Sequence, residues 1–350
     1  MTLPFDPPIS PVLAKLTKGI PEGPGWQFEP KWDGFRAIVY FDGEKCYIQS
    51  RDSKPLARYF PEVQAGLEAV LPGAVVLDGE IVIMGPKGID FDAMLMRIHP
   101  AESRVRMLAE RFPASFVAFD LLATGDEDLR ERPFEERRAR LDRTLGDGKP
   151  PLYITPMTRD RTLAQEWFDQ FEGAGFDGVI ARPLDQPYLA GQRALAKIKH
   201  MRTADCVVGG FRWLKDHEGE AVGSLLLGVY DEEGTFHHVG HTSSFSAKEK
   251  RELIPILAPY VTDNGDGFGD GRTPGSPTRW TQGKDLSWVR LSPVLVCEVN
   301  FDHLQGGRFR HAARFLRWRP DKPARECTYD QLDVAVPAEL QQIFAANRSD

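Results

Sequence analysis

A lysine opens a short polar turn at the edge of an apolar run: Lys31 begins the stretch KWDGFR. A lysine amine is a nucleophile only when it is neutral, and burial or neighbouring cations lower the pKa of a lysine. Trp32 and Phe28 stand beside Lys31 and are expected to limit its contact with water. The stretch therefore indicates covalent chemistry on Lys31, with a plain Asp-Gly turn as the structural alternative.

Two further lysines, Lys197 and Lys199, alternate along a stretch that is typical of a strand. Side chains two residues apart in a strand share a face, so we expect both ammonium groups on one side of a sheet. An edge strand decorated with lysines is the structural alternative. The chain has no G-x-x-x-x-G-K-[ST] loop and no G-x-G-x-x-G turn, so neither loop is available to hold a nucleotide.

The elements that must position these lysines fall into two groups. Up to about residue 202, strands and helices are mixed: a hairpin over 35–51 around Asp42-Gly43, a helix over 59–73, a strand pair over 74–84 around Asp78-Gly79, a strand over 115–122, a helix over 162–175, and strands over 176–183 and 194–200. Farther on, short strands are separated by Gly, Asp and Ser turns, with one helix over 246–260. The pattern predicts an α+β domain over 1–202 and an all-β barrel over 203–350.

Composition agrees with two globular domains. The chain has 350 residues, 41% of them hydrophobic and 27% charged. No apolar run is long enough for a membrane helix, and the N-terminus does not resemble a signal peptide, so we expect a cytoplasmic protein without a membrane partner. The four cysteines are far apart and are expected to be reduced, buried thiols. His237, His238 and His241 are expected to be packing or surface residues rather than zinc ligands.

The net charge of −7 argues mildly against a nucleic-acid partner, but the charges are unevenly distributed. The stretch 308–325 is strongly basic and has aromatic residues between its arginines. The stretch 127–143 mixes both signs and is interpreted as an ordinary helical surface.

Short motifs along nearly the whole chain resemble the covalent nucleotidyltransferases, the superfamily of ATP-dependent DNA ligases, RNA ligases and mRNA capping enzymes. In the family order, they are KWDGFR (motif I), Ser50-Arg51 (motif Ia), LDGEIV at 77–82 (motif III), FVAFDLL at 116–122 (motif IIIa), DGVIAR at 177–182 (motif IV), AKIK at 196–199 (motif V) and RWRPDK at 317–322 (motif VI). Each match alone is weak, but their order is specific. The match is closest to the short bacterial C-type DNA ligases, on FDGVIARPLDQPY, KIKHMRTADCVVGG and FLRWRPDKPARECTYDQL.

The resemblance assigns a role to each motif position. Lys31 would attack the α-phosphorus of ATP and carry AMP as a phosphoramidate. Glu29 would read the adenine edge, and Phe119 would stack on the adenine face. The remaining nucleotide contacts of the first domain would come from Arg36, Arg51, Glu80, Lys197 and Lys199. Arginine suits this task because its planar fork meets phosphate with two hydrogen bonds.

The resemblance also implies a metal ion and a second role for the barrel. Glu80 and Asp177 would hold Mg²⁺, or Mn²⁺ in its place, although most relatives have glutamate where this chain has Asp177. The barrel would be an OB fold. Its motif VI residues would orient the pyrophosphate leaving group, with Arg319 and Lys322 as nucleotide contacts: Arg317, Arg319, Asp321 and Lys322. DNA would be bound by Arg308, Arg310 and Arg314.

Together these features predict an ATP-dependent DNA ligase that seals nicks between a 5′-phosphate and a 3′-hydroxyl through lysyl-AMP and an adenylylated DNA end. The expected setting is bacterial DNA repair, with a monomeric enzyme associated with the nucleoid when it is on DNA. The resemblance implies a polymerase/primase partner. An RNA ligase, a GTP-dependent capping-type enzyme, and a catalytically dead OB module that binds nucleic acid stay open as alternatives.

Overall fold

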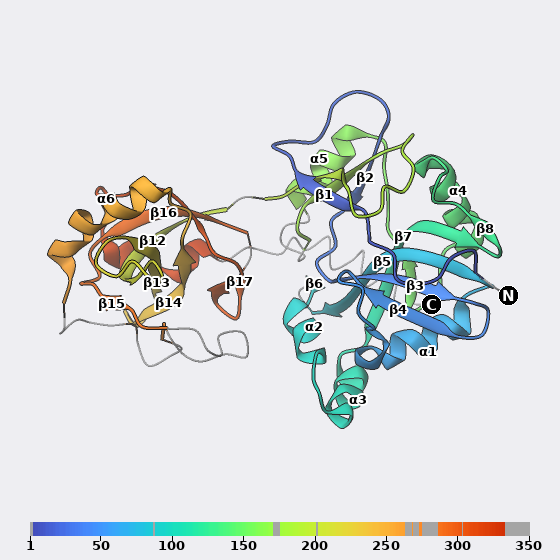
Figure 1. Cartoon of the computed structure of the whole chain (residues 1–350), viewed down its shortest axis with the longest axis horizontal. Coiled ribbons are helices and arrows are strands. Elements are labelled where there is room, and N and C mark those ends of the chain that lie inside the picture. The colour runs from blue at the N-terminus through green and yellow to red at the C-terminus, as the bar shows by residue number, and fades with distance from the viewer. Residues whose placement is uncertain are drawn as a thin grey trace. The chain divides into compact units, whose positions relative to one another are not determined.

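A computed structural model describes residues 3–86, 88–170, 176–200, 202–262, 268, 273–274, 286–302 and 304–332. The chain divides into two compact units, with residues Met1–His200 in the first and Met201–Asp333 in the second (Figure 1). Both are built mainly from antiparallel strands, and helices accompany them, which confirms the predicted α+β class.

The first unit contains two sheets. One sheet has the order β1-β11-β10-β2, and the other has the order β4-β3-β5-β7-β8, with β6 beside β5 and β9 beside β7. The strands are β1 (Leu13–Leu16), β2 (Trp26–Pro30), β3 (Phe35–Phe41), β4 (Cys46–Ser50), β5 (Val75–Gly85), β6 (Gly88–Ile89), β7 (Ala114–Thr124), β8 (Glu127–Asp128), β9 (Leu152–Ile154), β10 (Val179–Pro183) and β11 (Arg193–Ile198). The helices are η1 (Ala57–Tyr59), α1 (Pro61–Val70), α2 (Phe91–Arg97), α3 (Glu102–Arg111), α4 (Phe134–Leu145) and α5 (Arg161–Gln170).

The alternation of side chains along each strand gives each sheet two faces that pack against different partners. In the first sheet, Phe28, Val179 and Ile198 pack in one cluster with Ala164 of α5. In the second sheet, alternate residues such as Leu77 pack in a cluster that includes residues of α1. A third cluster joins the two sheets. It contains Ile38 of β3 together with residues of β11 and of the segment that precedes β1, so the remaining faces of the two sheets lie toward each other.

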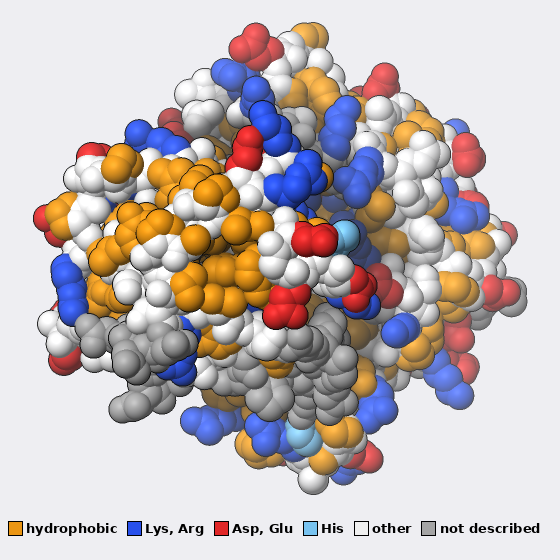
Figure 2. Space-filling view, turned by 60° about the vertical axis from the view of Figure 1, so that its left-hand side comes forward, with side chains coloured by type: hydrophobic (Ala, Val, Ile, Leu, Met, Phe, Trp, Pro, Cys, Tyr) orange, Lys and Arg blue, Asp and Glu red, His pale blue; other side chains and the backbone are white. Residues whose placement is uncertain are grey.

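The second unit is a strand-built domain with one sheet in the order β14-β13-β12-β16-β19, to which β15 is added beside β12. Its elements are β12 (Arg202–Trp213), β13 (Val222–Tyr230), β14 (Phe236–Thr242), α6 (Ala247–Leu257), η3 (Ala258–Tyr260), β15 (Val289–Arg290), β16 (Val296–Phe301), β17 (Leu304–Gln305), β18 (Arg308–Phe309), β19 (Arg314–Trp318), η4 (Ala324–Glu326) and η5 (Tyr329–Leu332). Helix α6 begins with a capping box, because Ser246 and Glu249 bond each other's backbone N–H. In Figure 2, where this unit comes forward, hydrophobic side chains gather over a broad part of its surface.

Two expectations about the first unit are wrong. Asp78-Gly79 is not a turn: β5 runs through it from Val75 to Gly85. A glycine is needed there because a Cβ on Gly79 would lie 2.4 Å from the ring of Phe116. The stretch 127–143 is also more than a solvated surface, since Arg137 and Arg138 of α4 are buried.

The other elements follow the sequence more closely. The hairpin around Asp42-Gly43 is β3 and β4, which pair in antiparallel register. All four cysteines are buried and free of disulfides. No helix among the described residues is long and apolar enough to cross a bilayer. The helix expected over 162–175 begins at Arg161, and residues 171–175 lie outside the described part of the chain.

His238, on β14 of the second unit, packs at the edge of the Phe268 ring. Both of its ring nitrogens are buried and have no hydrogen-bond partner among the described residues. Burial, together with the positive charges of Arg308 and Arg212, lowers the pKa of His238 to about 3. Within the described part of the chain, no three His, Cys, Asp or Glu side chains are arranged to hold a metal ion. His238 packs against Phe268, and its burial favours the neutral form of the ring.

We predict that this histidine makes the second unit sensitive to acid. In the unfolded chain it takes up a proton near pH 6.5, whereas the folded chain resists protonation down to about pH 3. Stability should therefore fall as the pH falls below 6.5, by about 2 kcal/mol at pH 5 for this group. Urea unfolding at pH 7.5 and pH 5 measures the loss in the wild type and in His238→Phe. An equal loss of stability between pH 7.5 and pH 5 in both proteins would contradict the assignment of the acid sensitivity to His238. Each protein is compared with itself at the two pH values, so the effect of the substitution on packing cancels.

Candidate active site

A cleft of about 220 Å³ opens in the first unit and is lined by both sheets. Its lining residues are Pro11, Val12, Leu13, Ala14, Glu29, Pro30, Lys31, Trp32, Arg36, Arg51, Glu80, Phe119, Ile180, Arg182, Arg193, Leu195 and Lys197. The cleft thus brings together seven residues that the sequence marked along the chain: Glu29, Lys31, Arg36, Arg51, Glu80, Phe119 and Lys197. Phe28 faces α5 instead, so it does not shield Lys31 as expected.

The pairing of three strands explains one wall of the cleft. Ile180 of β10 pairs with Glu29 of β2 on one side and with Lys197 of β11 on the other. Directly paired residues lie on the same face of a sheet, so these three side chains form one row. Lys31 directly follows β2, and Lys199 directly follows β11.

Between Lys31 and Lys199, a glycine immediately precedes the middle strand, β10. The Lys31 N–H donates to the carbonyl oxygen of Gly178 over 2.8 Å. Gly178 has a φ of +124°, and a Cβ on it would lie 1.9 Å from the carbonyl oxygen of Ile198. The backbone can take this path only without a side chain.

The carboxylate before this glycine joins the two lysines. The Oδ2 atom of Asp177 is 2.5 Å from Nζ of Lys31 and 2.6 Å from Nζ of Lys199. Asp177 is nearly buried, and both lysine side chains are about one-fifth exposed. The expected closeness of Lys31 and Lys199 is therefore present, with Asp177 as the anion between them.

Lys197 adds a third ammonium group to this side of the cleft. Burial lowers the pKa of Lys197, and the charges of Lys199 and Lys31 lower it further. Arg51 and Arg193, both exposed, line the same cleft. The lysines and arginines together make a strongly cationic wall, which suits a polyphosphate.

The second sheet contributes the opposite wall. Arg36 of β3 pairs directly with Glu80 of β5. The Gly34 N–H donates to Oε1 of Glu80 over 3.2 Å. Burial raises the pKa of Glu80 to about 7, although Arg36 and Lys31 oppose this rise.

Phe119 reaches the cleft through an irregularity in β7. Asp78 pairs with Asp120 and Gly79 pairs with Ala118, so Phe119 is the extra residue between them. Such bulges redirect a side chain, and they often occur beside active sites. The sequence motif had marked Phe119, but the bulge could not be predicted from it.

Arg36 is held more firmly than the sequence suggested. Its Nε and Nη2 atoms each donate to a carboxylate oxygen of Asp78 over 2.6 Å. The Tyr188 hydroxyl donates to the same carboxylate over 2.7 Å. The guanidinium carbon lies 4.4 Å from the centre of the Phe119 ring. Asp78 and Tyr188 were not among the expected site residues, although Asp78 lies inside the LDGEIV motif.

Arg182 is a further residue that the sequence interpretation missed. Its Nε atom donates to Oε1 of Glu29 over 2.7 Å, and its guanidinium carbon lies 4.7 Å from the centre of the Phe119 ring. The other oxygen of Glu29, Oε2, is buried and has no hydrogen-bond partner among the described residues. Burial raises the pKa of Glu29, while Arg182 opposes the rise. Arg182 is the last residue of the DGVIAR motif, and this position was the signal that could have identified it.

The expected residues of the second unit form ion pairs within that unit. Arg319 contacts Asp205 and Asp321, Arg317 contacts Glu298, and Lys322 contacts Glu326. Arg308 lies on β18, and Arg314 begins β19, where it is exposed. Arg310 follows β18 and is half-buried.

Comparison with known proteins gives consistent matches. Residues 11–199, more than half of the chain, match the family model described as ATP dependent DNA ligase domain. Residues 218–322 match the model described as ATP dependent DNA ligase C terminal region. These matches agree with the expected adenylation-type domain followed by an OB fold.

Curated relatives match over nearly their full length. The chain is 49% identical to DNA ligase C of Mycobacterium tuberculosis over 361 residues, which is 99% of this chain and 100% of that protein. It is 45% identical to DNA ligase C1 of Mycolicibacterium smegmatis, over 98% of this chain and 99% of that protein. A solved structure of a Lig E DNA ligase shares the fold, with a TM-score of 0.56, 20% identity, and coverage of 89% of this chain and 99% of that chain.

We predict that the glycine between the two lysines cannot be replaced. Gly178→Ala should lower the free energy of unfolding by about 3 kcal/mol, because the new Cβ meets a backbone oxygen and a positive φ strains alanine. Gly73→Ala is the matched control, since a Cβ there meets nothing within 4 Å. Urea unfolding of the two variants should separate them clearly. Equal stability would show that β10 and β11 can shift apart without cost.

Proposed function

The chain belongs to the ATP-dependent DNA ligase family, and on this premise we propose that it seals DNA nicks through an AMP carried on Lys31. In the first step, Nζ of Lys31 forms a bond to the α-phosphorus of ATP while the bond to pyrophosphate breaks. In the second step, an oxygen of the 5′-phosphate at the nick bonds to the phosphorus of AMP, and the bond from that phosphorus to Nζ of Lys31 breaks. In the third step, the 3′-hydroxyl attacks that phosphate and AMP leaves. The observation that supports this proposal is the placement of Lys31 in one cleft with Glu29, Phe119 and Lys197.

The cleft offers suitable partners for the base and the sugar. Oε2 of Glu29 is a buried acceptor without a partner among the described residues, so it is suited to the 6-amino group of adenine. Phe119 offers a ring for stacking on the base, because the bulge turns it into the cleft. Arg36 and Glu80, from neighbouring strands, are proposed to contact the ribose.

The cationic wall suits the phosphates. We assign Lys197, Lys199 and Arg51 to the α-phosphate and its neighbours, where they would neutralise charge that develops on attack. Lys31 must lose a proton before it attacks, because only the neutral amine is a nucleophile. Asp177 binds both Lys31 and Lys199 and so keeps the proposed nucleophile at the cleft.

The donor set also fits a magnesium ion. Mg²⁺ in phosphate sites is held by one or two carboxylates together with phosphate oxygens and water. Glu80 and Asp177 both lie near Lys31: Asp177 contacts its Nζ atom, and the positive charge of Lys31 acts on the Glu80 carboxyl group. We propose that these two carboxylates hold Mg²⁺, or Mn²⁺, which would offset negative charge on the phosphates when bound.

The second unit has proposed roles in both ATP and DNA binding. We assign Arg317, Arg319, Asp321 and Lys322 to the orientation of pyrophosphate. Arg308, Arg310 and Arg314 are assigned to the DNA backbone, which basic residues of OB folds commonly contact. A monomer working in bacterial DNA repair in the cytoplasm, with a polymerase/primase partner, stays a prediction. The RNA-ligase, capping-enzyme and dead-module alternatives are not favoured, because the closely matching relatives reported above are DNA ligases.

We predict that Lys31 carries the label from α-labelled ATP. Lys31→Ala should form labelled protein at least about a thousandfold more slowly than wild type, because no other group supplies the nucleophile. Lys54→Ala, at an exposed lysine of the same unit, is the control and should label normally. Addition of unlabelled nicked DNA should discharge the label from wild type and join the strands. Label on Lys31→Ala at the wild-type rate would contradict the role of this residue.

We predict that Asp177 contributes to metal binding. Asp177→Asn keeps the size of the side chain but removes the charge, so the Kd for Mn²⁺ should rise about tenfold or more. Electron paramagnetic resonance of free Mn²⁺ measures this directly, without turnover. Asp185→Asn, at an exposed aspartate of the same unit, should leave the Kd unchanged. An unchanged Kd for Mn²⁺ in Asp177→Asn would contradict the role in metal binding. Asp177 would then be only the ion-pair partner of Lys31 and Lys199.

A further inference from the structure

Arg182 lies at the centre of a buried group of charged and aromatic side chains. It is 2% exposed, and Glu29, its partner, is equally buried. The guanidinium contacts Glu29 through Nε, and its carbon lies within 5.2 Å of the ring centres of both Phe119 and Phe134. One arginine therefore contacts both the proposed base-reading carboxylate and the proposed base-stacking ring.

A second ion pair, with Asp120, also holds Arg182 in place. Nη1 of Arg182 is 3.9 Å from Oδ2 of Asp120, the residue after Phe119. Asp120 in turn accepts two hydrogen bonds from Arg137 of α4, over 2.8 and 2.9 Å. Arg137 also donates to the carbonyl oxygen of Gln186. The position of Arg182 is thus determined by groups from strand β7, helix α4 and the loop after β10.

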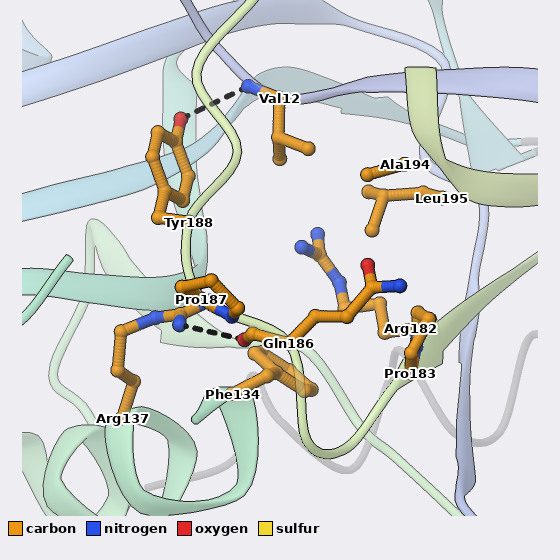
Figure 3. Close-up of a pocket in the computed structure, with 10 residues that line it drawn as sticks. All are labelled: Val12, Phe134, Arg137, Arg182, Pro183, Gln186, Pro187, Tyr188, Ala194 and Leu195. Carbon is orange, nitrogen blue, oxygen red and sulfur yellow. Dashed lines mark hydrogen bonds between the residues drawn. The ribbon is translucent and has the colours of Figure 1, made fainter. Parts of the chain in front are cut away.

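Arg182 lines two cavities. It lines the nucleotide-sized cleft, and it lines a second cavity of about 10 Å³, which has room for one water molecule. Figure 3 shows the guanidinium of Arg182 pointing into this second cavity, with the amide of Gln186 beside it. A smaller side chain at position 182 would open space behind Glu29 and allow that carboxylate to turn.

We propose that Arg182 is a positioning residue that gives the enzyme its preference for adenine. By holding Oε1 of Glu29, it leaves Oε2 in place as the acceptor for the 6-amino group of the base. Guanine has an oxygen at that position, which a carboxylate oxygen repels, and purine riboside has no substituent there at all. This inference rests on the proposed adenylylation of Lys31 and extends it to the choice of base.

Selectivity between nucleotides tests this role more directly than activity does. We would measure kcat/KM for lysyl-nucleotide formation with ATP, GTP and purine riboside triphosphate in the wild type and in Arg182→Lys. Lysine keeps the charge but lacks the planar fork, so Glu29 would lose its fixed orientation. The preference for ATP over purine riboside triphosphate should fall about tenfold, since a hydrogen bond to a charged group contributes a factor of this order.

Arg97 supplies a closely matched control elsewhere in the same unit. It is fully buried, donates two hydrogen bonds to Glu62, and lies 4.9 Å from the centre of the Phe60 ring. It does not line the cleft. Arg97→Lys should therefore lower stability while leaving the nucleotide preference unchanged. If Arg182→Lys does not fold, Arg182→Gln, which removes the charge but keeps a hydrogen-bonding side chain, is measured instead.

The outcomes separate this inference from the proposed function. A fall in preference for the Arg182 variant alone supports the positioning role. An equal loss of kcat/KM with all three nucleotides, or the same change in Arg97→Lys, overturns it and shows a merely structural arginine. A wild type that labels with ATP but shows no preference also overturns it, while the ligase assignment stands. A wild type that no nucleotide labels would contradict the proposed function itself.

Discussion

The pairing of β10 with β2 and β11 is the constraint on which the rest of the site depends. Because strand side chains alternate between faces, this pairing fixes in one step which residues look toward α5 and which look into the cleft. Phe28, Val179 and Ile198 fill the core, while Glu29, Ile180 and Lys197 form a row on the other side. A shift of one residue in any of these strands would exchange the two sets. The apolar packing against α5 therefore also determines the register of the side chains that line the cleft.

A set of buried ion pairs lies behind this row. Arg36 is paired with Asp78, Arg182 with Glu29, and Arg137 with Asp120. Buried pairs of this kind contribute little net stability, because desolvation of the charges offsets their attraction. Their value in this site is geometric: Arg36 and Arg137 make bidentate contacts, and such a contact restricts an arginine to one orientation. The pairs also hold Arg36 and Arg182 against Phe119.

The sequence did not predict the surroundings of residues whose type is compatible with more than one structural environment. Asp78-Gly79 has the composition of a turn, yet Gly79 lies within a strand because the ring of Phe116 occupies the space of a side chain. Arg137 belongs to a helix with charges of both signs. The local pattern could not show that Arg137 would be buried in an ion pair with Asp120, which lies seventeen residues earlier. Arg182 was part of a recognised motif but had no local feature that indicated its contact with Glu29.

The sequence by itself determined the class of the fold and the enzyme family, and it marked Lys31 as the proposed nucleophile. These depend on strand and helix periodicity and on short ordered motifs, which are local properties of the chain. Only the tertiary structure decided that Asp177 lies between Lys31 and Lys199, that a bulge turns Phe119 into the cleft, and that Arg182 holds Glu29. Such contacts join residues that are far apart in sequence, so they depend on strand register and packing. No local pattern encodes which distant partner a buried charge will meet.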